Sequence, residues 1–276
     1  MLVVSELSKS YPTAGEPLSV LRGVNLELSP GQSAAIVGPS GSGKTTLLQI
    51  LGTLDEPDSG SVQINGQDPF ALDARERAAY RNQTIGFIFQ DHHLLPQLSV
   101  TENVLIPALA NGKPTGDDTT RAAELIDAVG LSHRATHLPR ELSGGERERV
   151  AIARALLMQP FVVLADEPTG NLDSKTAKTI TELLLRLQAE QNTVLVTVTH
   201  SLSLADDMNE RFELVDGALV RRDRFGLKHC NRSNDSICAL AWSCEGSCKD
   251  CTAVRYKGSR FSSVITVCTI AATIQS

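Results

Sequence analysis

The chain has 276 residues and a formal net charge of −6, with 21% charged residues. This length is sufficient for one large domain or two small ones with a full hydrophobic core, and the acidic balance argues against a nucleic-acid-binding protein, which normally carries a basic excess. No apolar run approaches the roughly 18 residues that cross a bilayer, and the N-terminus lacks a basic segment followed by an apolar one. We therefore expect a protein of the cytosol, or one that partners hold at a membrane.

The cysteines divide the sequence into two parts. All six lie between Cys230 and Cys268, and the single tryptophan, Trp242, lies in the same segment. Such a break in composition indicates a folded unit that ends near Val220 and an appendage after it.

The first elements are predicted to form a small antiparallel sheet. Short apolar runs at residues 2–7 and 24–28 are separated by proline and glycine, as is typical of strands joined by turns. Tyr11 lies at the end of the first run. Its ring could stack on a purine, although a lone tyrosine beside a proline is more often a turn or packing residue.

A glycine-rich loop follows the apolar residues 35–37 and precedes a helical pattern that begins near Thr46. Strand, glycine loop and helix in this order form a phosphate cradle, because successive N–H groups point into one hollow at the positive end of the helix. The residues expected around the phosphates are Gly38, Pro39, Ser40, Gly41, Ser42, Gly43, Lys44, Thr45 and Thr46. We expect Lys44 to reach the β- and γ-phosphates and the Thr45 hydroxyl to bind Mg²⁺. The flanking strand and helix disfavour the alternative, a turn that fits the pattern by chance.

The next predicted elements lead to a polar side chain at a strand end. Residues 61–64 are expected to form a strand followed by a hairpin turn at Asn65-Gly66, and residues 73–81 have helical composition. The apolar run 85–89 is typical of a buried strand and ends at Gln90. The carboxyl end of a parallel strand faces the crevice where ligands bind, so Gln90 could contact Mg²⁺ or the attacking water. A lone glutamine is otherwise an ordinary surface amide.

A helical subdomain is predicted at about residues 91–145. The runs 100–110 and 119–129 have helical periodicity and are joined by a linker that contains glycine and proline. His92 and His93 raise the question of a metal site, but adjacent histidines are poor joint ligands and no cysteine or third histidine has suitable spacing. We expect a structural or interface role for them.

The segment Leu-Ser-Gly-Gly-Glu at residues 142–146 opens a helix that is predicted to run to about Met158. Ser143 suits the N-cap, the two glycines leave the backbone bare, and the helix N-terminus forms a second anion-binding end. Because one nucleotide needs one cradle, this second end must serve something else or face another molecule.

Two carboxylates follow the buried apolar run 161–165. Asp166 is placed to hold Mg²⁺, and Glu167 to orient and deprotonate a water that attacks the γ-phosphate. Helix capping is the alternative role for such a pair, and the upstream glycine loop favours catalysis. A polar turn and a helix at residues 175–191 come next, and the β-branched run 193–199 ends in His200, which could hydrogen-bond a γ-phosphate oxygen.

Taken together, the glycine loop, Gln90, the Leu-Ser-Gly-Gly-Glu segment, the two carboxylates and His200 resemble the ATP-binding subunit of ABC transporters over residues 1–222. The resemblance implies an α/β P-loop NTPase core with an antiparallel β subdomain and a helical insertion. It also implies a head-to-tail homodimer in which Ser143, Gly144, Gly145 and Glu146 of one subunit cover the ATP of the other. In that arrangement Tyr11 stacks on adenine, Gln90 couples the nucleotide to two integral-membrane subunits, and Asp173 lies at the dimer contact.

Three stretches, residues 81–107, 131–156 and 164–173, are similar to the ATPases of lipoprotein-releasing systems. This similarity implies a subunit at the cytoplasmic face of the bacterial inner membrane that drives delivery of lipoprotein cargo to a periplasmic carrier. ATPases of cell-division complexes and macrolide exporters share parts of these stretches and remain alternatives. Ser201 stands where such proteins usually have aspartate, beside the histidine rather than at the chemistry.

Two other classes of protein fit less well. ABC ATPases of translation or DNA repair usually carry two ATPase units or a long coiled-coil insertion, and neither is found in this sequence. A regulator that only binds nucleotide conflicts with the presence of Glu167.

The segment 223–276 contains Cys244, Cys248 and Cys251 at the spacing C-x₃-C-x₂-C. A zinc or cluster site is one interpretation. The other, which we favour, is a poorly structured extension, because a composition rich in serine and cysteine without periodicity builds little core.

Overall fold

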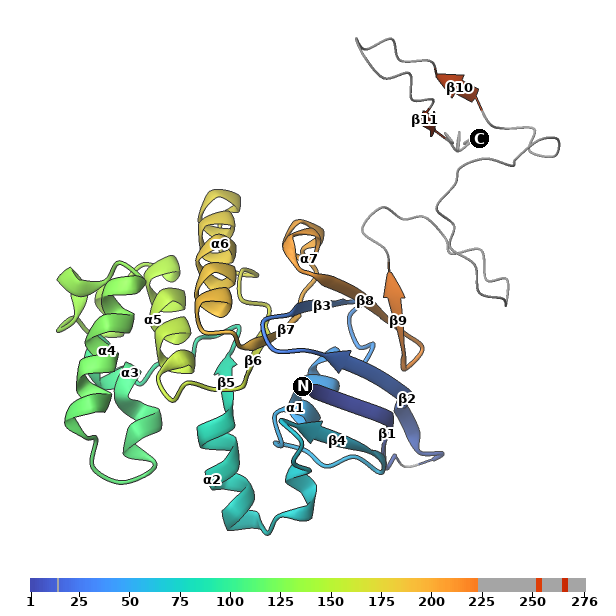
Figure 1. Ribbon diagram of the computed structural model, residues 1–276, viewed down its shortest axis with the longest axis horizontal. Coiled ribbons are helices and arrows are strands. Elements are labelled where there is room, and N and C mark those ends of the chain that lie inside the picture. The colour runs from blue at the N-terminus through green and yellow to red at the C-terminus, as the bar shows by residue number, and fades with distance from the viewer. Residues whose placement is uncertain (14, 223–251, 255–264, 268–276) are drawn as a thin grey trace. The chain divides into compact units, whose positions relative to one another are not determined.

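A computed structural model of the chain describes residues 1–13, 15–222, 252–254 and 265–267 (Figure 1). The chain divides into two compact units, Met1–Lys228 and His229–Ser276. In the second unit the structure describes one antiparallel pair, β10 (Thr252–Val254) and β11 (Ile265–Val267). The three cysteines Cys244, Cys248 and Cys251, and the rest of the extension expected to be poorly structured, lie outside the described residues.

The first unit contains the predicted antiparallel sheet. Strands β1 (Leu2–Tyr11), β2 (Leu18–Leu28) and β4 (Ser59–Ile64) are arranged in the order β2-β1-β4, and both pairings are antiparallel. The turn predicted at Asn65-Gly66 is present, but the hairpin that it closes is minimal. Both residues have positive φ, 54° and 78°, but a single bridge, Ile64 to Gln67, follows the turn. The chain then enters a short 3₁₀ helix, η1 (Pro69–Ala71), in which proline has no N–H to extend a ladder.

A second sheet has the strand order β5-β6-β7-β3-β8-β9. Its strands are β3 (Ser33–Val37), β5 (Ile85–Ile88), β6 (Val162–Asp166), β7 (Val194–Val198), β8 (Glu210–Val215) and β9 (Ala218–Arg222). All pairings are parallel except that of β9 with β8. The carboxyl ends of β5, β6, β7 and β3 therefore share one edge of the sheet.

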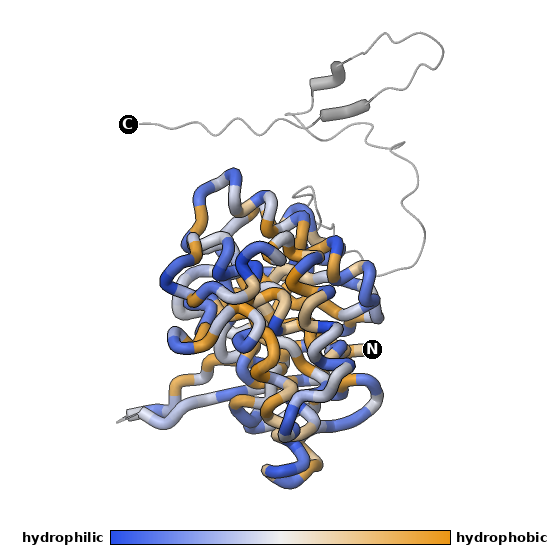
Figure 2. The backbone as a smooth tube through the Cα atoms, turned by 90° about the vertical axis from the view of Figure 1, so that its left-hand side faces the viewer, coloured by the Kyte–Doolittle hydropathy of each residue, from blue (hydrophilic) through white to orange (hydrophobic). Residues whose placement is uncertain are grey.

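Side chains alternate between the two faces of this sheet and enter two separate cores. In β6, Val162 and Leu164 pack into a core with the antiparallel sheet and α1 (Lys44–Leu51), whereas Val163 and Ala165 pack into a core with the other helices. Those helices are α3 (Val100–Leu109), α4 (Gly116–Ala128), α5 (Gly144–Leu156), α6 (Ser174–Glu190) and α7 (Leu202–Asp207). Figure 1 shows the antiparallel strands on one side and the helices α3, α4 and α5 on the other. Figure 2 shows hydrophobic segments concentrated inside this unit, where burial of apolar surface stabilises the fold.

Capping boxes fix where several helices begin. In α2 (Ala74–Thr84), α3, α4 and α5 the N-cap side chain accepts a backbone N–H, and an acidic side chain three residues later accepts the N–H of the N-cap residue. Short 3₁₀ turns, η2 (Ser132–Arg134) and η3 (Pro139–Glu141), lead into α5. The predicted helices are all present. Among the helices α1–α7, the structure has none with the length and apolar character needed to span a bilayer.

Candidate functional site

The candidate site lies at the edge of the parallel sheet where β5, β6, β7 and β3 end. Asp166 is the last residue of β6, Gln90 follows β5 by two residues, and His200 follows β7 by two residues. The glycine loop leaves β3 and enters α1. The parallel topology thus brings together residues that are far apart in the chain, from the glycine loop at Gly38 to His200.

The glycine loop leaves the N-terminus of α1 open for an anion. Gly43 is the N-cap with φ 99°, and no side chain caps the helix, so the first N–H groups of α1 have no intrahelical partner. A Cβ atom at Gly43 would lie 2.8 Å from Val20 Cγ1. The buried Ser42 hydroxyl has no hydrogen-bond partner. Such a cradle fits phosphate oxygens, which accept hydrogen bonds from both kinds of donor.

Lys44 is held inside the loop. Its side chain is buried, and Nζ donates to the carbonyl oxygens of Gly38 at 3.0 Å and Pro39 at 2.8 Å. Burial lowers the pKa of Lys44, and the charges of Glu167 and Asp166 oppose that shift. The ammonium group therefore lies within electrostatic reach of both carboxylates.

Thr45 and Asp166 form the pair that fits Mg²⁺. Burial and the charge of Glu167 raise the pKa of Asp166, while Lys44 and a hydrogen bond with the Thr45 hydroxyl act in the opposite direction. The described residues contain no group of three or more His, Cys, Asp or Glu side chains that could hold a metal by themselves. This donor set suits Mg²⁺, which usually keeps waters and substrate phosphates in its coordination shell and uses one or two carboxylates.

Glu167 has an unusual backbone conformation, and its two carboxylate oxygens have different surroundings. Its φ is +48°, a left-handed conformation that costs a non-glycine residue of the order of 1–3 kcal/mol. Its N–H donates to the Val198 carbonyl at 2.9 Å. Oε2 accepts from the Thr199 hydroxyl at 3.1 Å and from the His200 N–H at 3.2 Å, whereas the buried Oε1 has no hydrogen-bond partner. One carboxylate oxygen is thus fixed and the other is available.

His200 contacts Glu167, and Gln90 lies near the turn that follows it. The exposed His200 ring has Nε2 3.6 Å from Glu167 Oε1. The Gln90 carbonyl accepts from Asn171 Nδ2 at 3.4 Å, and a Cβ atom at Gly170 would lie 3.6 Å from Gln90 Nε2. Gln90 therefore lies beside the turn that follows Glu167, as its position at a strand end predicts.

Tyr11 is linked to two residues that the sequence analysis did not identify. Its hydroxyl donates to Asp55 Oδ2 at 2.6 Å, and Lys9 Nζ lies 2.8 Å from Asp55 Oδ1. No local pattern indicates this contact, because Asp55 is 44 residues from Tyr11. Thr199 was missed as well, although its place at the end of β7 could have identified it in the same way as Gln90.

The Leu-Ser-Gly-Gly-Glu segment lies apart from the glycine loop. Ser143 is an exposed N-cap, as predicted, and forms a capping box with Glu146. Glu146 also lies 3.3 Å from Arg134 Nε. The apolar side chains of α5 pack in the core on the opposite face of the sheet from α1. The two helix ends that are predicted to bind anions therefore belong to different layers of the unit.

Asp173 is the N-cap of α6. Its carboxylate accepts from the N–H groups of Lys175 and Thr176, both at 3.1 Å. Its side chain is exposed, so one helix cap is presented at the surface close to Asn171 and Gly170.

A family model described as "ABC transporter" matches residues 21–170, which include the glycine loop, Gln90, Ser143 to Glu146 and both carboxylates. The chain belongs to the ABC transporter family. It is 97% identical over 227 residues, 82% of this chain and 99% of the relative, to "Lipoprotein-releasing system ATP-binding protein LolD 1" of Rhodopirellula baltica. It is 50% identical over 220 residues, 80% of this chain and 98% of the relative, to the protein named LolD in Geobacter metallireducens.

Solved structures confirm the ABC ATPase fold. The chain superposes on a dimeric, post-hydrolysis ATP-binding cassette, MJ0796, bound to ADP and Pi, with a TM-score of 0.72 and 39% identity. That match covers 79% of this chain and 96% of the cassette. The predicted P-loop core with an antiparallel subdomain and a helical insertion is therefore confirmed.

The two adjacent histidines of this ABC ATPase have a structural role, as predicted. His92 Nδ1 lies 2.7 Å from Oε2 of the buried Glu148, in α5. Arg154 donates to the backbone carbonyl oxygens of His92 at 2.5 Å and His93 at 2.8 Å. These contacts tie the segment after Gln90 to the helix that begins at Ser143.

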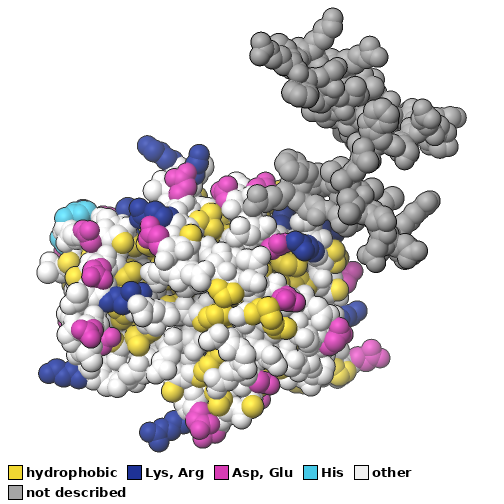
Figure 3. Space-filling model, in the orientation of Figure 1, with side chains coloured by type: hydrophobic (Ala, Val, Ile, Leu, Met, Phe, Trp, Pro, Cys, Tyr) yellow, Lys and Arg dark blue, Asp and Glu magenta, His cyan; other side chains and the backbone are white. Residues whose placement is uncertain are grey.

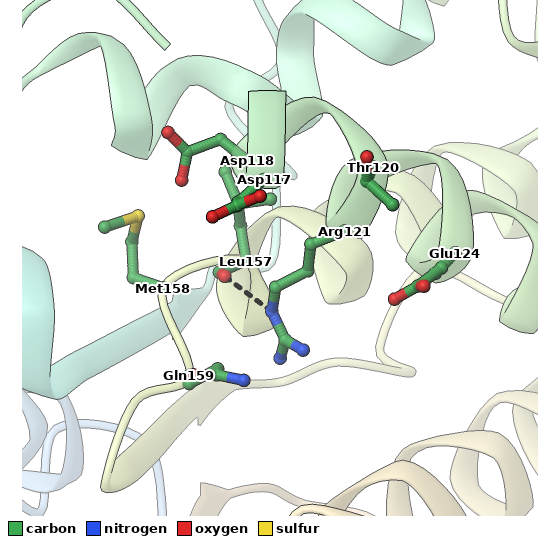
Figure 4. Close-up of a pocket in the computed structure, with 8 residues that line it drawn as sticks. All are labelled: Asp117, Asp118, Thr120, Arg121, Glu124, Leu157, Met158 and Gln159. Carbon is green, nitrogen blue, oxygen red and sulfur yellow. Dashed lines mark hydrogen bonds between the residues drawn. The ribbon is translucent and has the colours of Figure 1, made fainter. Parts of the chain in front are cut away.

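A polar cavity of about 400 Å³ lies away from the sheet edge of the ABC ATPase. It is lined by Asp117, Asp118, Thr120, Arg121, Glu124, Leu157, Met158 and Gln159 (Figure 4). Arg121 donates to the Leu157 and Leu156 carbonyl oxygens and to Gln191, so its hydrogen bonds connect α4 to the end of α5.

On the face seen in Figure 3, acidic and basic side chains are interspersed.

Proposed function

We propose that this ABC ATPase hydrolyses ATP to drive the release of outer-membrane-directed lipoproteins from the inner membrane to a periplasmic carrier. It would act as a homodimer bound to two integral-membrane permease subunits at the cytoplasmic face. The names of relatives that are 97% and 50% identical support this assignment. The observation that carries the catalytic part is the meeting of Lys44, Asp166 and Glu167 at one edge of the sheet.

The glycine loop would hold the triphosphate. The backbone N–H groups at the start of α1 and the Ser42 hydroxyl donate to phosphate oxygens, and Lys44 leaves its two loop carbonyls to contact the β- and γ-phosphates. Thr45, Asp166 and Gln90 would hold Mg²⁺, which neutralises charge between those phosphates when it is bound. Lys44 is buried and Asp166 is half-buried, which strengthens the electrostatic contacts of these two groups.

Glu167 would act as the general base. The Thr199 hydroxyl and the His200 N–H fix Oε2, which leaves Oε1 to accept a proton from the attacking water. The imidazole of His200, 3.6 Å from that oxygen, would hydrogen-bond the γ-phosphate. Loss of the γ-phosphate would therefore remove a group that both Lys44 and His200 contact.

The second anion-binding helix end would serve a partner subunit. Ser143, Gly144, Gly145 and Glu146 would close over the ATP of the other copy, with Asp173 at the contact between copies. This proposal is supported by the location of α1 and α5 in different layers and by the dimeric state of the MJ0796 cassette. Opening and closing of the pair would reach the membrane subunits through Gln90 and the helical segment after it.

The test is to purify the chain with the integral-membrane proteins that accompany it and to assay phosphate release with ATP and Mg²⁺. Membrane proteins that stimulate turnover and transfer an acylated protein to a soluble carrier are the expected result. Lys44→Ala should abolish turnover in the same complex. Partners that instead act in cell division or in drug export would support the alternative assignments, and the absence of phosphate release would refute the catalytic one.

A further inference from the structure

Asp55 links the side chains of Lys9 and Tyr11 next to the candidate nucleotide site. It lies in the loop after α1, and its two carboxylate oxygens have different partners. Oδ1 lies 2.8 Å from Lys9 Nζ, and Oδ2 accepts from the Tyr11 hydroxyl at 2.6 Å. The side chains of Lys9 and Asp55 are only 11% and 27% exposed, so solvent screens this contact less than it screens a surface ion pair.

The same contacts define the position of the Tyr11 ring. Lys9 Nζ lies 5.2 Å from the ring centroid, over one face, and it also donates to the Glu56 carbonyl at 2.6 Å. The hydroxyl is in hydrogen-bond contact with Thr46 as well as Asp55, and the Asp55 contact is the larger cause of the raised pKa of Tyr11. Thr46 belongs to the first turn of α1. The ring is thus fixed at its hydroxyl to the helix that carries the phosphate cradle, with a cation on one face.

We propose that Asp55 and Lys9 are positioning residues that hold the Tyr11 ring with its other face turned to the adenine base of ATP. The inference rests on the proposed function, in which Tyr11 stacks on adenine. A ring that is oriented before the ligand arrives loses less conformational freedom on binding, so more of the stacking contributes to affinity. Asp55 then controls how much the base, as distinct from the triphosphate, contributes to nucleotide affinity.

A merely structural role is the competing explanation, because Lys9 and Asp55 also join β1 to the loop after α1. The two roles differ in their dependence on the base. Inorganic tripolyphosphate contacts the cradle but has no base to stack. A loosened ring would weaken ATP alone, whereas a distorted cradle would weaken both compounds.

The experiment compares Asp55→Asn with wild type in the intact complex. It measures KM and kcat for ATP and the inhibition constant of tripolyphosphate against ATP hydrolysis. We expect KM to rise about three- to tenfold, which corresponds to part of the affinity of one stacked aromatic contact, with kcat within about twofold. The tripolyphosphate constant should not change. Glu56→Gln is the matched control, since Glu56 pairs through its side chain with Arg77 at 2.6 Å and does not contact the ring.

Variants of Tyr11 complete the test. Tyr11→Ala should raise KM for ATP and leave tripolyphosphate inhibition unchanged, and adding Asp55→Asn to it should have no further effect, because no ring remains to be positioned. Equal weakening of ATP and tripolyphosphate by Asp55→Asn, or additive effects in the double variant, would overturn the inference while the ATPase assignment stands. An unchanged KM in Tyr11→Ala would overturn both the inference and the proposed adenine contact. Absence of turnover in wild type would instead refute the proposed function.

Discussion

Glu167 combines a strained backbone with one fixed and one available carboxylate oxygen. Its φ of +48° is maintained by the hydrogen bond from its N–H to Val198 on the neighbouring strand. A strained backbone conformation persists only where contacts with the surrounding structure hold the residue in place. The parallel sheet provides that support, because Thr199 and His200 follow directly after the strand that holds Glu167.

Glu167→Gln is therefore expected to retain nucleotide binding and to lose turnover. Glutamine keeps the shape of the side chain but cannot accept the proton of the attacking water, so kcat should fall by about 10²- to 10⁴-fold. Phosphate release measured beside an ATP-binding assay checks this. Turnover at the wild-type rate would show that another group is the base.

A second residue-scale prediction concerns Glu148, which contacts His92. Burial raises the pKa of Glu148, and the hydrogen bond and charge of His92 oppose the shift. Between the ordinary value of 4.5 and its raised value, the folded protein binds more protons than the unfolded chain, so this carboxyl contributes less to stability as the pH rises. Glutamine does not titrate, so the Glu148→Gln variant does not lose this contribution to stability as the pH rises.

The free energy of unfolding of wild type relative to Glu148→Gln should thus decrease as the pH rises above the ordinary value of 4.5, by up to about 1.4 kcal/mol for each unit by which the pKa is raised. Urea unfolding at several pH values measures the difference. Glu182→Gln serves as the control, because the Glu182 side chain is 66% exposed in α6. A difference that stays constant or grows in favour of wild type would contradict the prediction.

At the scale of elements, the glycines of α5 have unequal roles. A Cβ atom at Gly145 would lie 2.6 Å from Thr176 Cγ2, whereas one at Gly144 would meet Leu172 Cδ2 at an ordinary 3.5 Å. Gly145 therefore permits the close approach of α5 to α6.

Gly145→Ala should lower the free energy of unfolding by about 1–3 kcal/mol through overpacking. Gly144→Ala should leave it unchanged or raise it by up to about 1 kcal/mol, since alanine favours the helix. Denaturant unfolding without nucleotide separates this packing effect from ATP binding. Equal effects of the two substitutions would show that Thr176 moves aside.

The sequence predicts elements well where its local signals are strong. The Ser143 N-cap and its partner Glu146 mark the start of α5 to the residue, and the buried apolar runs of β5, β6 and β7 are found within one residue of their predicted bounds. The six-residue helix α7 and the charged strand β9 carry too little periodicity to be predicted. The turn at Asn65-Gly66 is present but closes only one bridge, because a turn signal does not indicate how long the partner strand is.

At the scale of the whole molecule, topology assembles what local patterns identify separately. Lys44, Asp166 and Glu167 were each predicted from a motif, and the parallel order β5-β6-β7-β3 brings their strand ends together. Asp55 could not be assigned in that way, because its role arises from a contact with a residue 44 positions away in the sequence. Thr199 follows a predicted strand, but its contact with Glu167, 32 residues away, is found only in the structure.

Mixed dimers test whether each site is shared between two copies. In a homodimer, Lys44→Ala disables both phosphate cradles and Ser143→Arg blocks both helix ends that cover them, so neither should hydrolyse ATP. A dimer with one copy of each variant has one intact cradle facing one intact helix end, and should recover about half of the wild-type activity per dimer, provided that the sites work independently.

Phosphate release by differently tagged, copurified copies measures this recovery. A mixture of wild-type and Lys44→Ala copies controls for subunit exchange. If mixed dimers form and remain as inactive as each parent, the two sites are either not shared or cannot turn over singly, and a nucleotide-binding assay on the mixed dimer distinguishes these outcomes.

The hydrogen bonds of Lys44 to the carbonyl oxygens of Gly38 and Pro39 also affect the affinity of the loop for different anions. The ammonium group already donates hydrogen bonds to the loop. A bound anion must replace these two hydrogen bonds, so its net gain in binding free energy is only the difference between its own contacts and theirs. A lone phosphate or sulfate offers few additional contacts in exchange. A chain of linked phosphates can contact the helix end and the ammonium group simultaneously, so we expect the loop to bind triphosphates in preference to small inorganic anions.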